Sequence, residues 1–168
     1  MTKMEIRKMT VADASAVVTL NRAVEQVTSP MDLDRFSELH DLSCFKRVVE
    51  MAGQVVAFVI VMSHGQPYDN ANYQWFDVRF DDFFYIDRIV VSDVCRGRGV
   101  GRALYSHIEE QALSCGVLIL CAEIDTDPPN FESLAFHERL GFCHHGSRVL
   151  ENGKKVSMQL RSLGSSCT

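Results

Sequence analysis

The feature that most constrains this chain is a glycine-rich loop between an apolar strand and a helix. Residues 83–91 are apolar and β-branched, which favours a central strand. The loop Arg96-Gly97-Arg98-Gly99-Val100-Gly101-Arg102 follows, and apolar residues then recur at helical spacing to residue 114. Glycines let a backbone approach a ligand closely, and the N–H groups that open a helix favour a phosphate. We therefore expect an anion site here, to which Arg96, Arg98 and Arg102 add positive charge.

Two familiar phosphate loops do not fit this segment. A Walker loop ends in Gly-Lys-Ser/Thr, whereas this loop continues as Gly101-Arg102-Ala103. A dinucleotide fingerprint is spaced Gly-x-Gly-x-x-Gly near the first strand, whereas these glycines are spaced Gly-x-Gly-x-Gly in mid-chain. Because neither fingerprint fits, a nucleotide-binding regulatory domain is the least favoured interpretation of this loop.

The remaining chain predicts strands and helices in a mixed order. Strands are expected at residues 4–9, 45–51, 54–62, 83–91, 117–124, 142–150 and 154–160, and helices at 11–26, 33–42, 100–114 and 131–140. Thr10 and Asp13 resemble a capping box, and Asn130 is a candidate N-cap.

Residues 63–82 form a long connection that either carries function or lacks order. Its aromatic residues Tyr73, Trp75 and Phe76 line an acceptor pocket or a subunit contact, or pack under the loop.

A second motif covers the last expected helix. It is Asn130-x-x-Ser133-x-x-Phe136-His137-Glu138-Arg139-Leu140-Gly141-Phe142. Together with Arg-x-x-Gly-x-Gly at residues 96–101, this motif resembles the signature of the GNAT superfamily of acyl-CoA-dependent N-acyltransferases. The resemblance implies an α/β (α+β) fold, with a mixed, mostly antiparallel sheet of about seven strands flanked by about four helices. One domain is expected over residues 4–163, with a flexible tail at 164–168.

The resemblance also implies a cofactor site for acetyl-CoA. Backbone groups of Ile89, Val90 and Val91 would bind the pantetheine amides. The pyrophosphate would lie on the amides of Arg96, Gly97, Arg98, Gly99, Val100, Gly101 and Arg102. Asn130, Ser133 and His137 are further expected cofactor contacts. By analogy with the family, the acceptor would enter near residues 27–36, which contain Asp32, Asp34 and Arg35.

Candidate catalytic residues follow from the expected reaction, in which an amine attacks the acetyl thioester directly. The family commonly uses a tyrosine to protonate the leaving thiolate, and His137 stands at that position here. Asp87, on the expected central strand, is the leading candidate for the base, with Glu123 and Asp125 as alternatives. A backbone N–H near Val90 or Val91 would polarise the thioester carbonyl.

Composition excludes several other classes of protein. The chain has 17 basic and 22 acidic residues, a net charge of −5, which does not favour nucleic-acid binding. It has neither an apolar run long enough for a membrane nor a secretory signal at its start, so a cytoplasmic location is expected. The six cysteines are scattered and are expected as buried free thiols. Cys143, His144 and His145 are adjacent on a strand, where neighbours face opposite ways, so no metal is expected.

The sequence therefore predicts a soluble N-acetyltransferase that transfers the acetyl group of acetyl-CoA to a primary amine in a ternary complex. The acceptor is a small molecule or a peptide, and a homodimer is left open. The alternative is an acyl-CoA-binding sensor or interaction module with little or no turnover. The departure from tyrosine at His137 keeps that alternative open.

Overall fold

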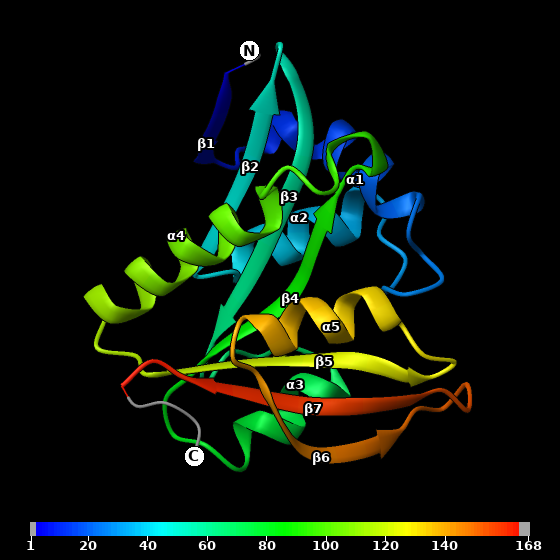
Figure 1. Cartoon of the computed structure of the whole chain (residues 1–168), viewed down its shortest axis with the longest axis vertical. Coiled ribbons are helices and arrows are strands. Elements are labelled where there is room, and N and C mark those ends of the chain that lie inside the picture. Colours follow the sequence, from blue (N-terminus) through cyan, green and yellow to red (C-terminus); the bar gives the residue numbers. More distant parts are fainter. Residues whose placement is uncertain (1–2, 165–168) are drawn as a thin grey trace. The chain divides into compact units, whose positions relative to one another are not determined.

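The computed structural model describes residues 3–164 of the chain. The strands are β1 Met4–Lys8, β2 Phe45–Met51, β3 Gln54–Ser63, β4 Phe84–Val91, β5 Ile119–Asp127, β6 Cys143–Val149 and β7 Lys155–Ser162. The helices are α1 Ala14–Arg22, α2 Leu33–Leu42, α3 Ala71–Asp77, α4 Val100–Ser114 and α5 Phe131–Arg139, with 3₁₀ turns at Val11–Asp13 and Asp93–Cys95. Figure 1 shows these elements along the chain.

The strand order is β1-β2-β3-β4-β5-β7-β6. Strand β4 pairs with β5 in parallel, whereas the pairs β1–β2, β2–β3, β5–β7 and β6–β7 are antiparallel. The predicted mixed, mostly antiparallel sheet of seven strands is therefore confirmed. Residues 3–164 contain five α-helices rather than the four expected, because α3 forms inside the segment 63–82.

Contacts along the chain group it into two compact units. The first comprises residues up to 62 together with 86–111, and the second comprises 63–85 together with the residues from 112 onward. The single domain over residues 4–163 stays a prediction. Of the predicted tail at 164–168, Gly164 is the one residue inside the described range.

In the first unit, β3 accounts for much of the core. Its residues from Val56 to Met62 are all buried, a continuous apolar run typical of a strand covered on both faces. Leu39 of α2 and Leu104 of α4 are also fully buried. Each large apolar side chain buried in this way contributes roughly 1.5–3 kcal/mol to folding.

The first helix ends earlier than the sequence predicts. The expected helix ran to Gln26, but α1 ends at Arg22 and the chain continues through turns. There the N–H groups of Val24 and Val27 bond to carbonyls three residues back, at Asn21 and Val24. The spacing of apolar residues does not indicate this helix end. The end depends on the Asn21 side chain, which donates to the Ser29 carbonyl and tightens the turn.

The predicted capping box at Thr10 and Asp13 is confirmed. The Asp13 carboxylate accepts from the Thr10 N–H at 2.8 Å and from both terminal nitrogens of Arg7, at 2.8 and 3.0 Å. The Arg7 guanidinium therefore lowers the pKa of Asp13, against the opposing effect of burial. Stability from this contact is present above the ordinary aspartate pKa and is lost as pH falls through the lowered value.

Asp13→Asn is expected to lower the free energy of unfolding by about 1–3 kcal/mol at pH 7, because charge-assisted hydrogen bonds to a side chain with 7% exposure are lost. Urea titrations at pH 7 and pH 3 measure this. The difference from the wild-type chain should shrink at the lower pH. The exposed Asp34, changed to Asn, is the matched control and should be near neutral. A gap that stays constant with pH would contradict the assignment.

In the second unit, the segment 63–82 is ordered and folds back on β6. Asn70 caps α3, with its Oδ1 accepting from the Tyr73 N–H at 3.0 Å. Tyr73 and Phe76 are buried, so they belong to the core. A Cβ on Gly146 of β6 would lie 2.7 Å from the Trp75 ring, so the absence of a side chain at Gly146 lets α3 pack there. The segment 63–82 thus contains a docked helix of seven residues.

The described cysteines are all free thiols, as predicted, but their burial differs from the prediction. Cys95 and Cys121 are buried, whereas Cys44, Cys115 and Cys143 are exposed. The prediction of burial was wrong for these three, because composition does not show which side of an element faces water. Within residues 3–164, no helix is long and apolar enough to cross a bilayer.

Candidate functional site

The glycine-rich loop lies between β4 and α4 in the first unit. Gly97 has a φ of +73° and Gly99 a φ of +76°, which L-residues with a side chain rarely adopt. A Cβ on either glycine would meet no protein atom within 4 Å. Glycine is therefore favoured at both positions by the positive φ and not by a lack of space for a side chain. The space beside the loop is open, as close approach of a ligand demands.

The start of α4 supplies hydrogen-bond donors. Helix α4 begins at Val100, and the Ala103 N–H donates to the Gly99 carbonyl at 2.9 Å. The N–H groups of Val100, Gly101 and Arg102 precede that bond, so they belong to the orphan donors of a helix N-terminus. Such donors, with the positive end of a 15-residue helix dipole, favour an anion.

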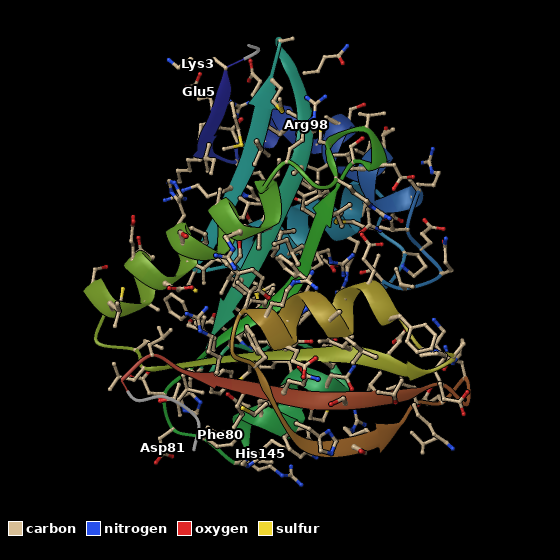
Figure 2. The ribbon with its side chains drawn as sticks, viewed as in Figure 1. Lys3, Glu5, Phe80, Asp81, Arg98 and His145 are labelled. Carbon is tan, nitrogen blue, oxygen red and sulfur yellow. The ribbon has the colours of Figure 1, made fainter. Side chains whose placement is uncertain are left out.

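Three arginines surround this helix start. Arg96, Arg98 and Arg102 are all exposed. Arg96 forms an ion pair with Asp93 at 2.9 Å, in which both side chains are largely exposed. Among the described residues no ion pair involves Arg98 or Arg102, which leaves their charge available to a ligand. Figure 2 labels Arg98 on the loop ahead of α4.

The end of β4 has backbone that suits an extended ligand. The parallel register with β5 covers Phe84 and Tyr85, and the strand then continues to Val91. On the other edge, the Ser92 N–H donates to the Val56 carbonyl at 2.8 Å. Ile89 and Val91 are half-buried and Val90 is buried. These residues lie beyond the register with β5, where the sequence predicts the pantetheine contacts.

In the second unit, α5 brings Asn130, Ser133 and His137 together. Asn130 is the N-cap, as predicted, and its Oδ1 accepts from the Ser133 N–H at 3.2 Å. The Nδ1 of His137 lies 2.8 Å from the Ser133 carbonyl and 3.3 Å from the Ser133 hydroxyl. Cofactor contacts from these three residues stay predictions.

His137 is buried, with 4% exposure, between the rings of Phe136 and Phe142. Burial lowers its pKa, with the Ser133 carbonyl opposing that shift in part. The neutral imidazole therefore predominates near pH 7. If Nδ1 donates to the carbonyl, Nε2 of the neutral ring is an acceptor and has no proton to give. A role as general acid stays a prediction, and this environment weighs against it.

The three candidate carboxylates have different surroundings. In the first unit, Asp87 Oδ2 accepts from Arg88 Nε at 2.8 Å, and the Asp87 side chain has 2% exposure. In the second unit, Asp125 pairs with Lys154 at 3.2 Å. Glu123 accepts a 2.7 Å hydrogen bond from the Tyr85 hydroxyl and is half-buried. As whole residues both Asp87 and Glu123 are intermediate in burial, but Glu123 accepts from a neutral hydroxyl whereas Asp87 pairs with a buried guanidinium.

Sequence reasoning missed two residues of these clusters, Tyr85 and Arg88. Tyr85 lies in an apolar run and gives no signal of its hydrogen bond to Glu123. Arg88 does carry a signal, because a charge inside an apolar strand must find partners when it is buried. Its side chain has 3% exposure.

The histidines of the Cys143-His144-His145 segment have separate neighbours. His144 Nδ1 lies 2.6 Å from the Ser157 hydroxyl. The His145 ring lies 5.6 Å from that of Phe80, and Figure 2 labels both residues. Within residues 3–164 no group of three or more His, Cys, Asp or Glu side chains gathers as metal ligands do.

Comparison with known proteins defines the family. A model of the acetyltransferase (GNAT) family matches residues 15–142, so this chain belongs to the GNAT acetyltransferase family. Among curated protein sequences, none matches the chain.

Solved structures share the fold. Ard1 from Thermoplasma volcanium superposes with a TM-score of 0.77 at 19% identity, covering 96% of this chain and 99% of that one. The ribosomal-protein-S18-alanine N-acetyltransferase of Escherichia coli gives 0.72 at 17% identity, over 99% and 96%. The protein yncA of Salmonella typhimurium, solved with its cofactor acetyl-CoA, gives 0.73 at 20% identity, over 99% and 97%.

Proposed function

We propose that this chain is an acetyl-CoA-dependent N-acetyltransferase that acetylates a primary amine by direct attack in a ternary complex. The observation that carries the proposal is the loop with Gly97 and Gly99, where open backbone, a helix start and exposed arginines coincide. Membership of the GNAT acetyltransferase family supports it.

The residues of the first unit fit the cofactor. The orphan N–H groups of Val100, Gly101 and Arg102 would donate to a pyrophosphate, and the guanidinium of Arg98 would pair with its charge. Backbone groups of Ile89–Val91 would bind the pantetheine amides. Acetyl-CoA supplies the activated acetyl group as a thioester. An N–H near Val90 or Val91 would polarise its carbonyl, and holding both reactants contributes up to about 7–11 kcal/mol in favourable cases.

The chain must also move a proton, because an amine is mostly protonated at neutral pH. We propose Glu123 as the group that accepts this proton, directly or through water. The Tyr85 hydroxyl donates to Glu123 Oε2 at 2.7 Å and orients that oxygen, and Glu123 is half-buried. Asp87 remains the rival, although its ion pair with Arg88 favours a structural role. The neutral amine then attacks, so that the C–N bond forms and the acetyl C–S bond breaks. Of the two protons that the ammonium loses, one passes through Glu123 to solvent and the other ends on the CoA thiolate.

The acceptor is most usefully sought among amines of two kinds. Two similar structures are named as ribosomal-protein-alanine N-acetyltransferases, which suggests a peptide N-terminus as the first candidate. The second candidate is a small polyamine. The segment between α1 and α2, together with the start of α2, carries the exposed acidic side chains Asp32 and Asp34, which suit either cation.

Calorimetric titration with acetyl-CoA, followed by release of free CoA thiol, tests this function. The panel contains an alanyl peptide with a free N-terminus, a lysyl peptide with a blocked one, and spermidine. Saturable binding is expected, together with thiol release above the rate of hydrolysis for at least one amine. Mass spectrometry should find the acetylated product.

A second candidate function remains because His137 is buried and predominantly neutral where the family commonly has a tyrosine. The chain would then be an acyl-CoA sensor. Tight binding without thiol release from any amine would favour the sensor. Absence of binding would refute both functions, since both depend on the loop.

A further inference from the structure

Arg88 is a buried charge beside the strand segment assigned to the cofactor. Its side chain has 3% exposure, and it immediately precedes Ile89 in β4. A buried guanidinium needs charged or hydrogen-bonding partners, because an unpaired charge in a core is strongly destabilising. The partners of Arg88 therefore show what this residue holds in place.

Those partners come from β4, from the end of α1 and from the segment between α1 and α2. Arg88 Nε donates to Asp87 Oδ2 at 2.8 Å, and Nη1 donates to Asn21 Oδ1 at 3.0 Å and to the Ser29 carbonyl at 3.0 Å. Asn21 is fully buried, and its Nδ2 donates to the same Ser29 carbonyl at 3.0 Å. We name Asp87, Arg88, Asn21 and the Ser29 carbonyl the polar clamp. It fastens the segment 23–32 to β4.

The clamped segment has little regular structure of its own. Its internal bonds are short-range, with the N–H groups of Val27 and Thr28 both donating to the Val24 carbonyl. Met31 is buried, whereas Val27 is 43% exposed. The polar clamp therefore supplies a directional attachment of this segment to β4.

We propose that Arg88 is a positioning residue that sets the acceptor affinity of this enzyme. The inference rests on the proposed function. An amine that attacks a thioester held along Ile89–Val91 must approach β4, and the clamped segment meets β4 at Arg88, one residue before Ile89. Because the planar guanidinium holds Nε and Nη1 in a fixed geometry, lysine cannot make the same set of bonds. Arg88 governs the acceptor KM and leaves acetyl-CoA affinity largely unchanged.

The test is Arg88→Lys, assayed with spermidine and the alanyl peptide. The acceptor KM should rise about tenfold, with kcat changed by less than about threefold and the acetyl-CoA Kd by less than about twofold. Hydrogen exchange at the Val27 and Thr28 amides should accelerate. Asn21→Ala removes two bonds of the polar clamp but keeps the Asp87–Arg88 pair, so it should show the same pattern if Arg88→Lys folds poorly. Arg22→Lys, at the exposed end of α1, is the matched control.

Two results would overturn the inference. An unchanged acceptor KM, whether or not exchange accelerates, would leave Arg88 a purely structural residue. A loss of acetyl-CoA affinity as large as the change in acceptor KM would place its effect on the cofactor. Absence of thiol release by the wild-type chain would instead refute the proposed function, and with it any acceptor role. Normal wild-type turnover with unchanged variant KM refutes the inference alone.

Discussion

Acetyl-CoA affinity is expected to fall at least about 100-fold in the double variant Arg98→Glu/Gly99→Asp, because charge-assisted hydrogen bonds of about 1.5–3 kcal/mol each are lost. A glutamate at position 98 would repel a pyrophosphate that Arg98 attracts. A carboxylate on residue 99 would occupy the open space in front of the loop, where no protein atom lies within 4 Å. Calorimetric titration with acetyl-CoA measures the loss.

The chain offers a matched control for this variant. Arg22→Glu with Gly53→Asp makes the same change in net charge and places a side chain at another glycine with a φ of +75°. Gly53 lies in the turn between β2 and β3, where a Cβ also meets nothing within 4 Å. The control should bind acetyl-CoA with nearly wild-type affinity. Retained affinity in the loop variant would mean that the pyrophosphate binds elsewhere.

Glu123→Gln is expected to lower kcat/KM by about 10²–10⁴, the usual contribution of a general base. The amide keeps the size of the side chain and can still accept a hydrogen bond from Tyr85, but it cannot take a proton. Acetyl-CoA affinity should be nearly unchanged, because no cofactor contact is assigned to Glu123. Steady-state kinetics and calorimetry on the same preparation separate the two effects.

Asp87→Asn is the comparison that decides between the two carboxylates. If Asp87 only holds Arg88, its amide variant should affect turnover less than Glu123→Gln does. A greater loss of kcat/KM in Asp87→Asn, with acetyl-CoA affinity intact, would restore Asp87 as the base. Turnover that survives in both variants would leave proton removal to water or to another group.

Much of the fold could be predicted from local sequence signals. The helix at 33–42 and the strand at 45–51 have the predicted bounds, because periodicity and turn residues mark both ends. The predicted end of α1 was wrong, since it depends on a side-chain bond from Asn21 to Ser29, eight residues away. Helix α3 was not predicted because it is short, and because the burial of its aromatic residues depends on packing against elements distant in the sequence.

For the candidate site too, features made by neighbouring residues could be predicted from the sequence, whereas contacts between distant residues could not. The loop at residues 96–102 could be predicted, because glycines, arginines and a helix start are adjacent in the sequence. The bond between Tyr85 and Glu123 joins residues 38 apart, and the polar clamp joins Arg88 to Asn21 across 67 residues. No spacing rule indicates such pairs. The burial of His137 could not be predicted either, since a helix position does not reveal which neighbours cover it.

The left-handed backbone at Gly97 and Gly99 also determines which amino-acid substitutions this loop tolerates. Every single-base change in a glycine codon that still encodes a different amino acid introduces a residue with a Cβ. Each such residue would carry roughly 1–2 kcal/mol of backbone strain in this conformation. Replacement at either position is thus penalised by the backbone, although nothing nearby would clash with the new side chain. Arg98 between them is under no such conformational constraint, so charge at the loop can evolve while its backbone stays fixed.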